Sequence, residues 1–100
     1  MAAEVTLVNC FEIAAGQEDE FFALWQEVNA YMRLKPGYLG HKLHRAVSGE
    51  ASFRFVNVAK WASKEHFAAA HDDGFRALVG KPGWAAFRSR PGLYQVVHEG

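Results

Sequence analysis

Asn57 and Trp61 are the residues whose types and spacing best suit chemistry, and they lie four positions apart in the run FVNVAKW. Side chains alternate along a strand, so both would share one face with Phe55 and Ala59. A buried amide without a partner costs about 1 to 3 kcal/mol, so Asn57 is either satisfied by backbone groups or lines a polar pocket. The indole N–H of Trp61 could donate to a substrate oxygen, or the ring could stack on an aromatic ring. The alternative is a core aromatic residue that closes the strand end.

Three further residues extend this candidate site. His71 follows Phe67 by four residues on an apolar helical stripe. There it is either a satisfied core histidine or a base suited to neutral pH. Arg76 is a permanent cation near the expected mouth of the pocket, or else a surface arginine. Asn9 repeats the argument for Asn57 in the first strand, with backbone or water as the alternative partners.

The spacing of the histidines and the motifs of the sequence argue against a metal or a cofactor. His41 and His44 are three apart in a predicted strand and would face opposite sides, while His66 and His71 are five apart on a helix and diverge. We therefore expect no metal site. The sequence has no glycine-rich phosphate loop, no ordered Ser-His-Asp pattern and no flavin or nicotinamide motif. A redox reaction at this site would therefore need its substrate to supply the electrons.

Composition narrows the class of protein further. The chain has 100 residues, the usual size of one domain, and we expect a single domain over residues 1–100. Eleven basic and eleven acidic residues give zero formal net charge, which argues against nucleic acid or an anionic membrane as a partner. Cys10 is the single cysteine, so an internal disulfide is impossible. Residues 1–4 lack the features of a signal peptide, and the expected location is the cytoplasm.

Hydrophobic periodicity predicts the strands and helices that position the candidate site. It predicts strands at residues 4–12, 38–46, 52–61 and 93–98. It predicts helices at residues 17–34 and from Lys64 onward, the second capped by Ser63 and interrupted at residues 72–74. Residues 81–91 are expected to form a mostly irregular loop, whose Trp84 and Phe87 are candidates for a lid or for contacts across a dimer. The order indicates an α+β, ferredoxin-like βαββαβ fold, with an antiparallel sheet and both helices on one face.

Apolar residues on both faces of the predicted strands indicate self-association. Two helices cover one face, yet Val8, Cys10, Val56, Val58 and Val96 point to the other. Burying apolar area stabilises a fold by about 25 cal/mol per Å², so leaving that face exposed to water would cost several kcal/mol of stability. We therefore predict a two-fold homodimer that closes the two sheets into an α+β barrel.

At these positions the chain resembles the antibiotic biosynthesis monooxygenase family. The stretch FVNVAKWASKEHF at residues 55–67 resembles that family's strand ending in Trp, followed by a Ser-capped helix with an aromatic residue. Pro36-Gly37-Tyr38 matches its Pro-Gly-aromatic entry into the second strand, and residues 15–21 match its Gly, acidic turn and Phe. The likeness spans residues 5–97.

The resemblance implies a pocket between sheet and helices. In the cofactor-free anthrone oxygenases of the family, an Asn and a Trp four residues later bind and polarise the substrate, and Asn57 and Trp61 match them. An Arg after the second helix is matched by Arg76. A helix tyrosine of that branch falls at Phe67, which has no hydroxyl. In the haem-degrading branch Asn9 matches, but Ala70 and Val79 stand near the expected Trp and haem-ligating His. Haem degradation is therefore rejected unless His71 substitutes in a different pocket geometry.

The sequence thus leaves two function classes. The first is a cofactor-independent monooxygenase that acts on a small aromatic or quinol-type molecule with molecular oxygen. Its catalytic candidates are Asn57, Trp61 and His71, and its substrate-binding candidates are Asn9, Phe67, Arg76 and Trp84. The second is a non-catalytic dimeric module of the same fold that binds a small molecule or serves in stress response. Phe67 favours the second class and the Asn57–Trp61 pair favours the first.

Overall fold

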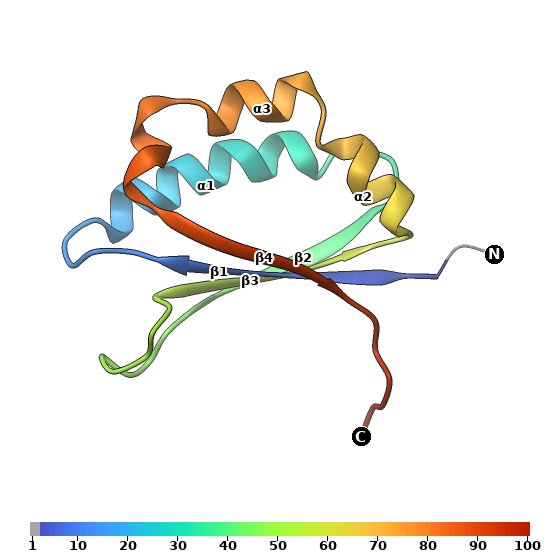
Figure 1. The fold of residues 1–100 in the computed structure, drawn as a ribbon, viewed down its shortest axis with the longest axis horizontal. Coiled ribbons are helices and arrows are strands. Elements are labelled where there is room, and N and C mark those ends of the chain that lie inside the picture. The colour runs from blue at the N-terminus through green and yellow to red at the C-terminus, as the bar shows by residue number, and fades with distance from the viewer. Residues whose placement is uncertain (1–2) are drawn as a thin grey trace.

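The computed structural model describes residues 3–100 and places them in two layers. Strands β1 (Val5–Glu12), β2 (Tyr38–Arg45), β3 (Phe55–Trp61) and β4 (Arg88–Tyr94) form a sheet in the order β2-β3-β1-β4, with every neighbouring pair antiparallel. Helices α1 (Glu18–Met32), α2 (Lys64–Ala70) and α3 (Asp73–Val79) all lie on one face (Figure 1). This arrangement confirms the predicted ferredoxin-like α+β fold.

Local signals explain where the helices begin. The stripe predicted for the first helix is buried at Phe21, Trp25 and Met32. Ser63 caps α2, because its side chain accepts a hydrogen bond from the His66 backbone N–H at 3.1 Å. The predicted interruption is real as well, since Asp72 caps a separate helix α3 through the Phe75 N–H. No helix within residues 3–100 is long and apolar enough to cross a membrane.

Two predicted strand boundaries are wrong. The third strand begins at Phe55 rather than residue 52. The last strand is Arg88–Tyr94 rather than residues 93–98, so the expected loop at 81–91 contains a 3₁₀ helix (Pro82–Ala86) and half of β4. Pro91 and Gly92 suggested a loop, but β4 is an edge strand, where one side of the backbone needs no ladder partner and proline is tolerated.

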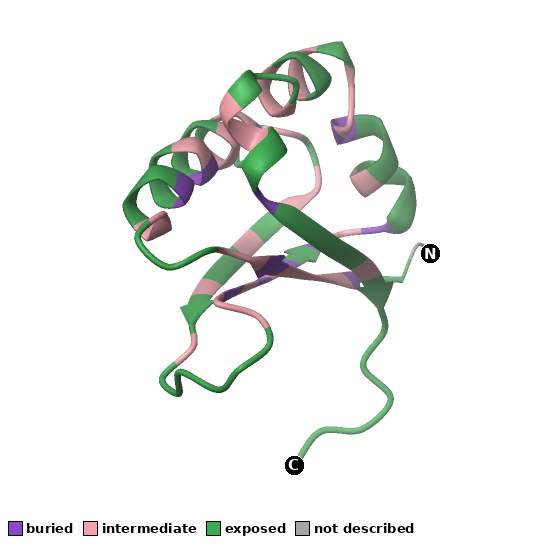
Figure 2. Cartoon of the chain, turned by 60° about the vertical axis from the view of Figure 1, so that its left-hand side comes forward, coloured by how far each residue is buried: buried purple, intermediate pink, exposed green. Residues whose placement is uncertain are grey.

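The core is divided into two apolar clusters on the helix-facing side of the sheet. One cluster comprises Val5, Met32, Ala59, Trp61 and Ala70. The other comprises Phe11, Phe21, Trp25, Phe55 and Phe87. Between them on the sheet lies the pair Asn9–Asn57, directly opposed in the β1–β3 register. The buried residues follow this interior layer, while the outer helix surfaces are exposed (Figure 2).

Candidate functional site

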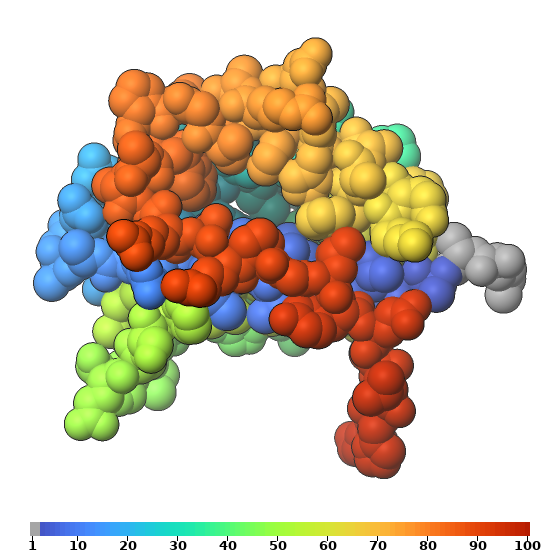
Figure 3. Space-filling model, in the orientation of Figure 1, coloured from blue at the N-terminus to red at the C-terminus, as the bar shows by residue number. Residues whose placement is uncertain are grey.

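A pocket of about 720 Å³ lies between the sheet and the helices. A volume of this size suits a small organic ligand. Residues of both core clusters border it, and β4, α2 and α3 surround its opening. The space-filling view shows the hollow between α2–α3 and β4, with α1 at its back (Figure 3). The lining is mostly apolar and aromatic, with polar exceptions at Asn9, Asn29, Tyr38, Asn57, Trp61, His71 and Ser89.

Three buried polar atoms in this lining have no hydrogen-bond partner among the described residues. They are the side-chain oxygens of Asn9 and Asn57 and the indole nitrogen of Trp61. Asn57 is 8% exposed and Trp61 only 1%. Buried polar groups in folded proteins are normally paired, so three orphaned groups around one cavity require a reason. Two acceptors and one donor are thus available to a molecule in the pocket.

Aromatic rings shape the wall around Trp61. Tyr38 meets it edge-on, with ring centroids 5.2 Å apart, and Phe67 does the same from α2 at 5.8 Å. These arrangements hold the indole in one orientation. Trp84 lines the opposite end of the pocket and contacts Phe21 and Phe87 edge-on. A flat ring system fits between such walls.

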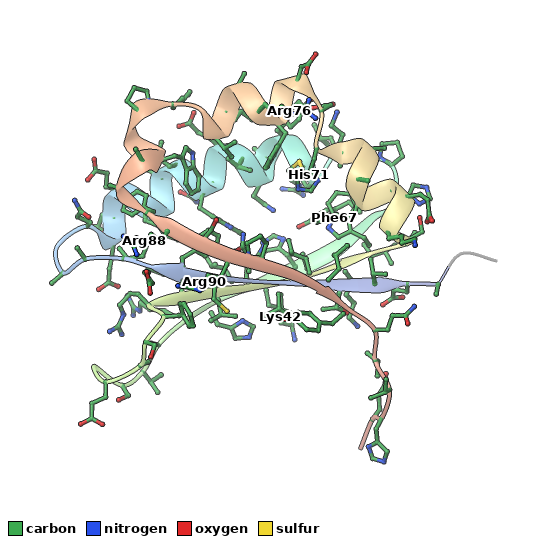
Figure 4. All side chains as sticks on the ribbon, in the orientation of Figure 1. Lys42, Phe67, His71, Arg76, Arg88 and Arg90 are labelled. Atoms are coloured by element: carbon green, nitrogen blue, oxygen red, sulfur yellow. The ribbon has the colours of Figure 1, made fainter. Side chains whose placement is uncertain are left out.

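His71 caps the end of α2 and lines the pocket between Phe67 and Phe75 (Figure 4). Its Nδ1 lies 2.6 Å from the carbonyl oxygen of Phe67. A carbonyl can only accept, so Nδ1 carries the proton and Nε2 has the free lone pair. His71 therefore offers a hydrogen-bond acceptor, or base, beside the cavity.

Arg76 is placed away from the pocket lining. It lies on the outer part of α3 (Figure 4) and pairs with Asp73 at 2.8 Å, with both side chains largely exposed. An exposed pair three residues apart on a helix contributes little to stability. The expected position at the pocket mouth is not observed, because the α2–α3 break turns this face of α3 outward.

Tyr38 and Asn29 are pocket residues that the sequence analysis did not single out. The Asn29 amide nitrogen donates to the Tyr38 hydroxyl at 3.1 Å, and that hydroxyl lies 2.5 Å from Nδ1 of His41. Burial raises the pKa of Tyr38. In the sequence, Tyr38 after Pro36-Gly37 indicates only the start of a strand. No local pattern indicates that the Tyr38 ring reaches a pocket beneath α1.

Asp72 connects α1 to the α2–α3 corner. Its carboxylate accepts hydrogen bonds from the Tyr31 hydroxyl at 2.7 Å and from Lys35 Nζ at 2.5 Å. The Lys35 hydrogen bond, followed by those from the Phe75 N–H and Tyr31, holds the pKa of Asp72 well below its usual range. Lys35 also lies 4.4 Å from the Tyr31 ring centroid. This cluster fixes the corner that carries His71.

The histidines do not gather around a common point. His41 faces the helix side of β2, where its ring contacts Trp25, while His44 bonds the Val56 carbonyl on the other face. This confirms that the two point to opposite sides. Across residues 3–100 no three His, Cys, Asp or Glu side chains come together in a metal-binding arrangement.

Comparison with known proteins gives consistent results. The family model for antibiotic biosynthesis monooxygenase matches residues 4–81. A protein from Shewanella loihica PV-4, provisionally described as a monooxygenase, is 30% identical, with a TM-score of 0.85 and 99% of each chain covered. No curated protein sequence matches the chain.

Further solved structures above 25% identity include SnoaB and MhuD. SnoaB, a cofactor-independent oxygenase from Streptomyces nogalater, is 28% identical, with a TM-score of 0.81 and coverage of 98% of this chain and 97% of that one. A variant of MhuD with two manganese protoporphyrin IX molecules bound per active site is 27% identical, with a TM-score of 0.75 and coverage of 95% and 96%.

Proposed function

The chain belongs to the antibiotic biosynthesis monooxygenase family, and on that premise we propose that it is a cofactor-independent monooxygenase for a small aromatic substrate. The substrate class is an electron-rich phenol, anthrone or quinol. The similarity to SnoaB supports the absence of a cofactor requirement. The zero net charge and the aromatic pocket walls support a neutral, flat substrate.

The observation that carries the proposal is the set of three orphaned polar atoms in the pocket. The Trp61 N–H donates to a substrate oxygen, and the amide oxygens of Asn57 and Asn9 accept from substrate hydroxyls. As negative charge develops on the substrate oxygen, a fixed donor in a dry pocket stabilises it more than water would. Phe67 and Trp84 contribute packing surface at the two ends.

The chemistry balances with oxygen as the only co-reactant. The carbon that becomes a carbonyl loses its two hydrogens as protons and bonds one atom of O₂. The substrate supplies the four electrons that reduce O₂, and the second oxygen atom leaves as water with the two protons. His71 Nε2 takes the proton from that carbon as the O–O bond breaks, and returns it to the departing hydroxide.

Haem is a poor fit to the same pocket. Ala70 is buried and Val79 lies in the pocket lining, and these are the positions compared above with the Trp and the ligating His, respectively, of haem-degrading relatives. Neither alkyl side chain can ligate iron.

A binding module is the second candidate, and Phe67 favours it. A phenylalanine cannot transfer protons where the anthrone oxygenases use tyrosine. In that case the orphaned groups would hold a ligand without turning it over.

We also propose that two copies pair through the face of the sheet opposite the helices. Val8, Val56 and Val58 form its centre, and the β1–β3 register brings Val8 and Val58 together. The β2–β3 connection and the C-terminal end both extend past this face (Figure 1), so a second copy would sit between them. The exposed charges of Lys42 and Arg90 lie around the apolar centre.

Oxygen uptake by the metal-free protein tests the catalytic proposal. With anthrones and quinols as substrates, Asn57→Ala and Trp61→Phe should each lower the enzymatic rate at least about tenfold, since a lost transition-state hydrogen bond costs about two to three orders of magnitude in well-studied sites. Arg76→Ala is the matched control and should retain the wild-type rate. Tight binding of these compounds without uptake would support the binding module instead, and equal rates in all variants would exclude this pocket as the site.

A further inference from the structure

We propose that Tyr38 and His41 form a proton exit from the pocket, on the side of the molecule opposite the substrate entrance. The inference rests on the proposed oxygenase function and assigns the group that ionises the substrate hydroxyl. Tyr38 is the catalytic residue, because it lines the pocket, and His41 acts through it.

The hydrogen-bond geometry assigns each donor and acceptor. An amide nitrogen only donates, and Asn29 Nδ2 lies 3.1 Å from the Tyr38 oxygen and 3.5 Å from His41 Nδ1. Nδ1 is therefore an acceptor, and the Tyr38 O–H, 2.5 Å away, donates to it. The Tyr38 oxygen keeps one lone pair for a hydroxyl in the pocket.

Tyr38 and His41 connect the pocket to the outer surface of the protein. Tyr38 lines the pocket, whereas His41 is exposed and lines a separate outer groove between α1 and β2, with Phe22, Trp25, Asn29, Arg33 and His44. The pocket opens beside β4 (Figure 3). In the strand order β2-β3-β1-β4, β4 and β2 are the two opposite edges of the sheet. A proton that passes from Tyr38 to His41 thus reaches solvent without using the substrate entrance.

The surroundings keep both groups in the required states. Burial raises the pKa of Tyr38, so its hydroxyl stays protonated and can donate. Partial desolvation in the groove and then the positive charge of Arg33 lower the pKa of His41, so its ring is neutral and can accept at pH 7. Arg33 is the charged group that faces His41 from α1, where Trp25 and Asn29 are neutral. Across the sheet its partner on β3 is the neutral Ala59.

The relay moves one proton and leaves the redox balance unchanged. In the enol form of the substrate, one of the two protons of the reacting carbon lies on the hydroxyl oxygen. This hydroxyl gives its proton to the Tyr38 oxygen as the Tyr38 proton moves to His41 Nδ1, and the resulting imidazolium loses its Nε2 proton to water. The substrate anion then bonds O₂. The peroxide regains one proton by the reverse path, which leaves the carbon-bound proton to His71.

An oxygen-free stopped-flow experiment separates this proposal from the oxygenase itself. Dithranol, a dihydroxyanthrone whose anion absorbs at longer wavelength than the neutral form, is mixed with protein under nitrogen at pH 7. The wild type should ionise it on binding. After stopped-flow mixing, Tyr38→Phe should bind it with a similar Kd, yet the anion signal should appear at least about tenfold more slowly, because the group that passes the proton to His41 is gone.

His41→Gln should likewise slow the appearance of the dithranol anion, with little change in Kd. His98→Gln, in the exposed C-terminal segment, is the matched control and should behave as wild type. A rate of ionisation that is unchanged in Tyr38→Phe would overturn the proton exit, even where oxygen uptake proceeds. Ionisation that needs Tyr38 without oxygen uptake would uphold the exit and reject the oxygenase.

Discussion

Asn57 lowers the folding stability of the protein and at the same time gives the pocket a polar group. Its amide oxygen is buried without a partner, directly across from Asn9, whose oxygen is in the same condition. Each such group costs about 1 to 3 kcal/mol when nothing binds it. A fold selected for stability alone would place apolar side chains here, as it does at Ala59 and Phe55 on the same strand. Strained or unsatisfied positions of this kind concentrate at functional sites.

Replacing Asn57 by leucine should therefore stabilise the empty protein. Asn57→Leu preserves the size of the side chain and removes the orphaned oxygen, so the free energy of unfolding should rise by about 1 kcal/mol. Urea denaturation followed by tryptophan fluorescence measures it. Asn57→Ala is the comparison and should gain less, because it leaves a cavity. A leucine variant that is less stable than wild type would mean that the amide holds the fold together.

At the scale of elements, the corner between α2 and α3 positions one wall of the pocket. Asp72 caps α3 and accepts hydrogen bonds from Tyr31 and Lys35 at the end of α1. Gly74 completes the corner, because a Cβ at this position would come 2.3 Å from the Tyr31 hydroxyl. His71, Phe75 and α1 are held in register by these contacts.

Asp72 and Asp73 provide a matched pair that tests this corner. Asp72→Ala removes a helix cap and two contacts to α1, so the urea midpoint should fall clearly at pH 7. Asp73→Ala removes only an exposed pair with Arg76, so the midpoint should stay within experimental error. Equal losses in the two variants would contradict the assigned role of Asp72.

The pH dependence of a second variant, Asp72→Asn, has a definite sign. The folded state lowers the pKa of Asp72, so the contribution of this carboxylate is fully present above its unfolded value of about 4. It is lost progressively as the pH falls below that value. The stability difference between wild type and Asp72→Asn should therefore be constant from pH 7 to about 5 and narrow below pH 4. A difference that widens in acid would reverse the assignment.

At the scale of the whole molecule, the sheet is covered on one face only. The helices, the pocket and both core clusters lie on one side, while Val8, Val56, Val58 and Cys10 line the other among exposed charges. Figure 4 shows Lys42 on this open side, opposite the helices. Apolar groups at the centre with charges at the rim are the usual anatomy of a protein interface.

A charge at the centre of this face should separate the two copies. Val58→Asp would bury a carboxylate between two sheets, so light scattering should show a monomer where the wild type is a dimer. Cys10, next to Val56 in the register, should then react several-fold faster with a thiol reagent. Leu34→Asp changes an exposed leucine beyond the end of α1 and should leave the dimer intact. A wild-type monomer at micromolar concentration would contradict the pairing.

Local sequence signals determined most helices and strands, and they also determined the two site residues that lie on the third strand. The alternation of the third strand put Asn57 and Trp61 on the helix-facing side, and Ser63 and residues 72–74 marked the helix boundaries, because such signals act within a few residues. The same signals misplaced the last strand, since the tolerance of Pro91 depends on β4 lying at an edge, which no local pattern records.

Only the tertiary structure decided which side chains meet and which stay unpaired. It turned Arg76 outward, brought Tyr31 to Asp72, and joined Tyr38 to Asn29 and His41 across the wall of the pocket. These contacts link residues whose positions depend on how α1 packs on the sheet. The sequence alone therefore determined the family, the fold and the candidate pair Asn57–Trp61. The orphaned atoms and the route for a proton depend on packing between distant segments, which short-range patterns do not encode.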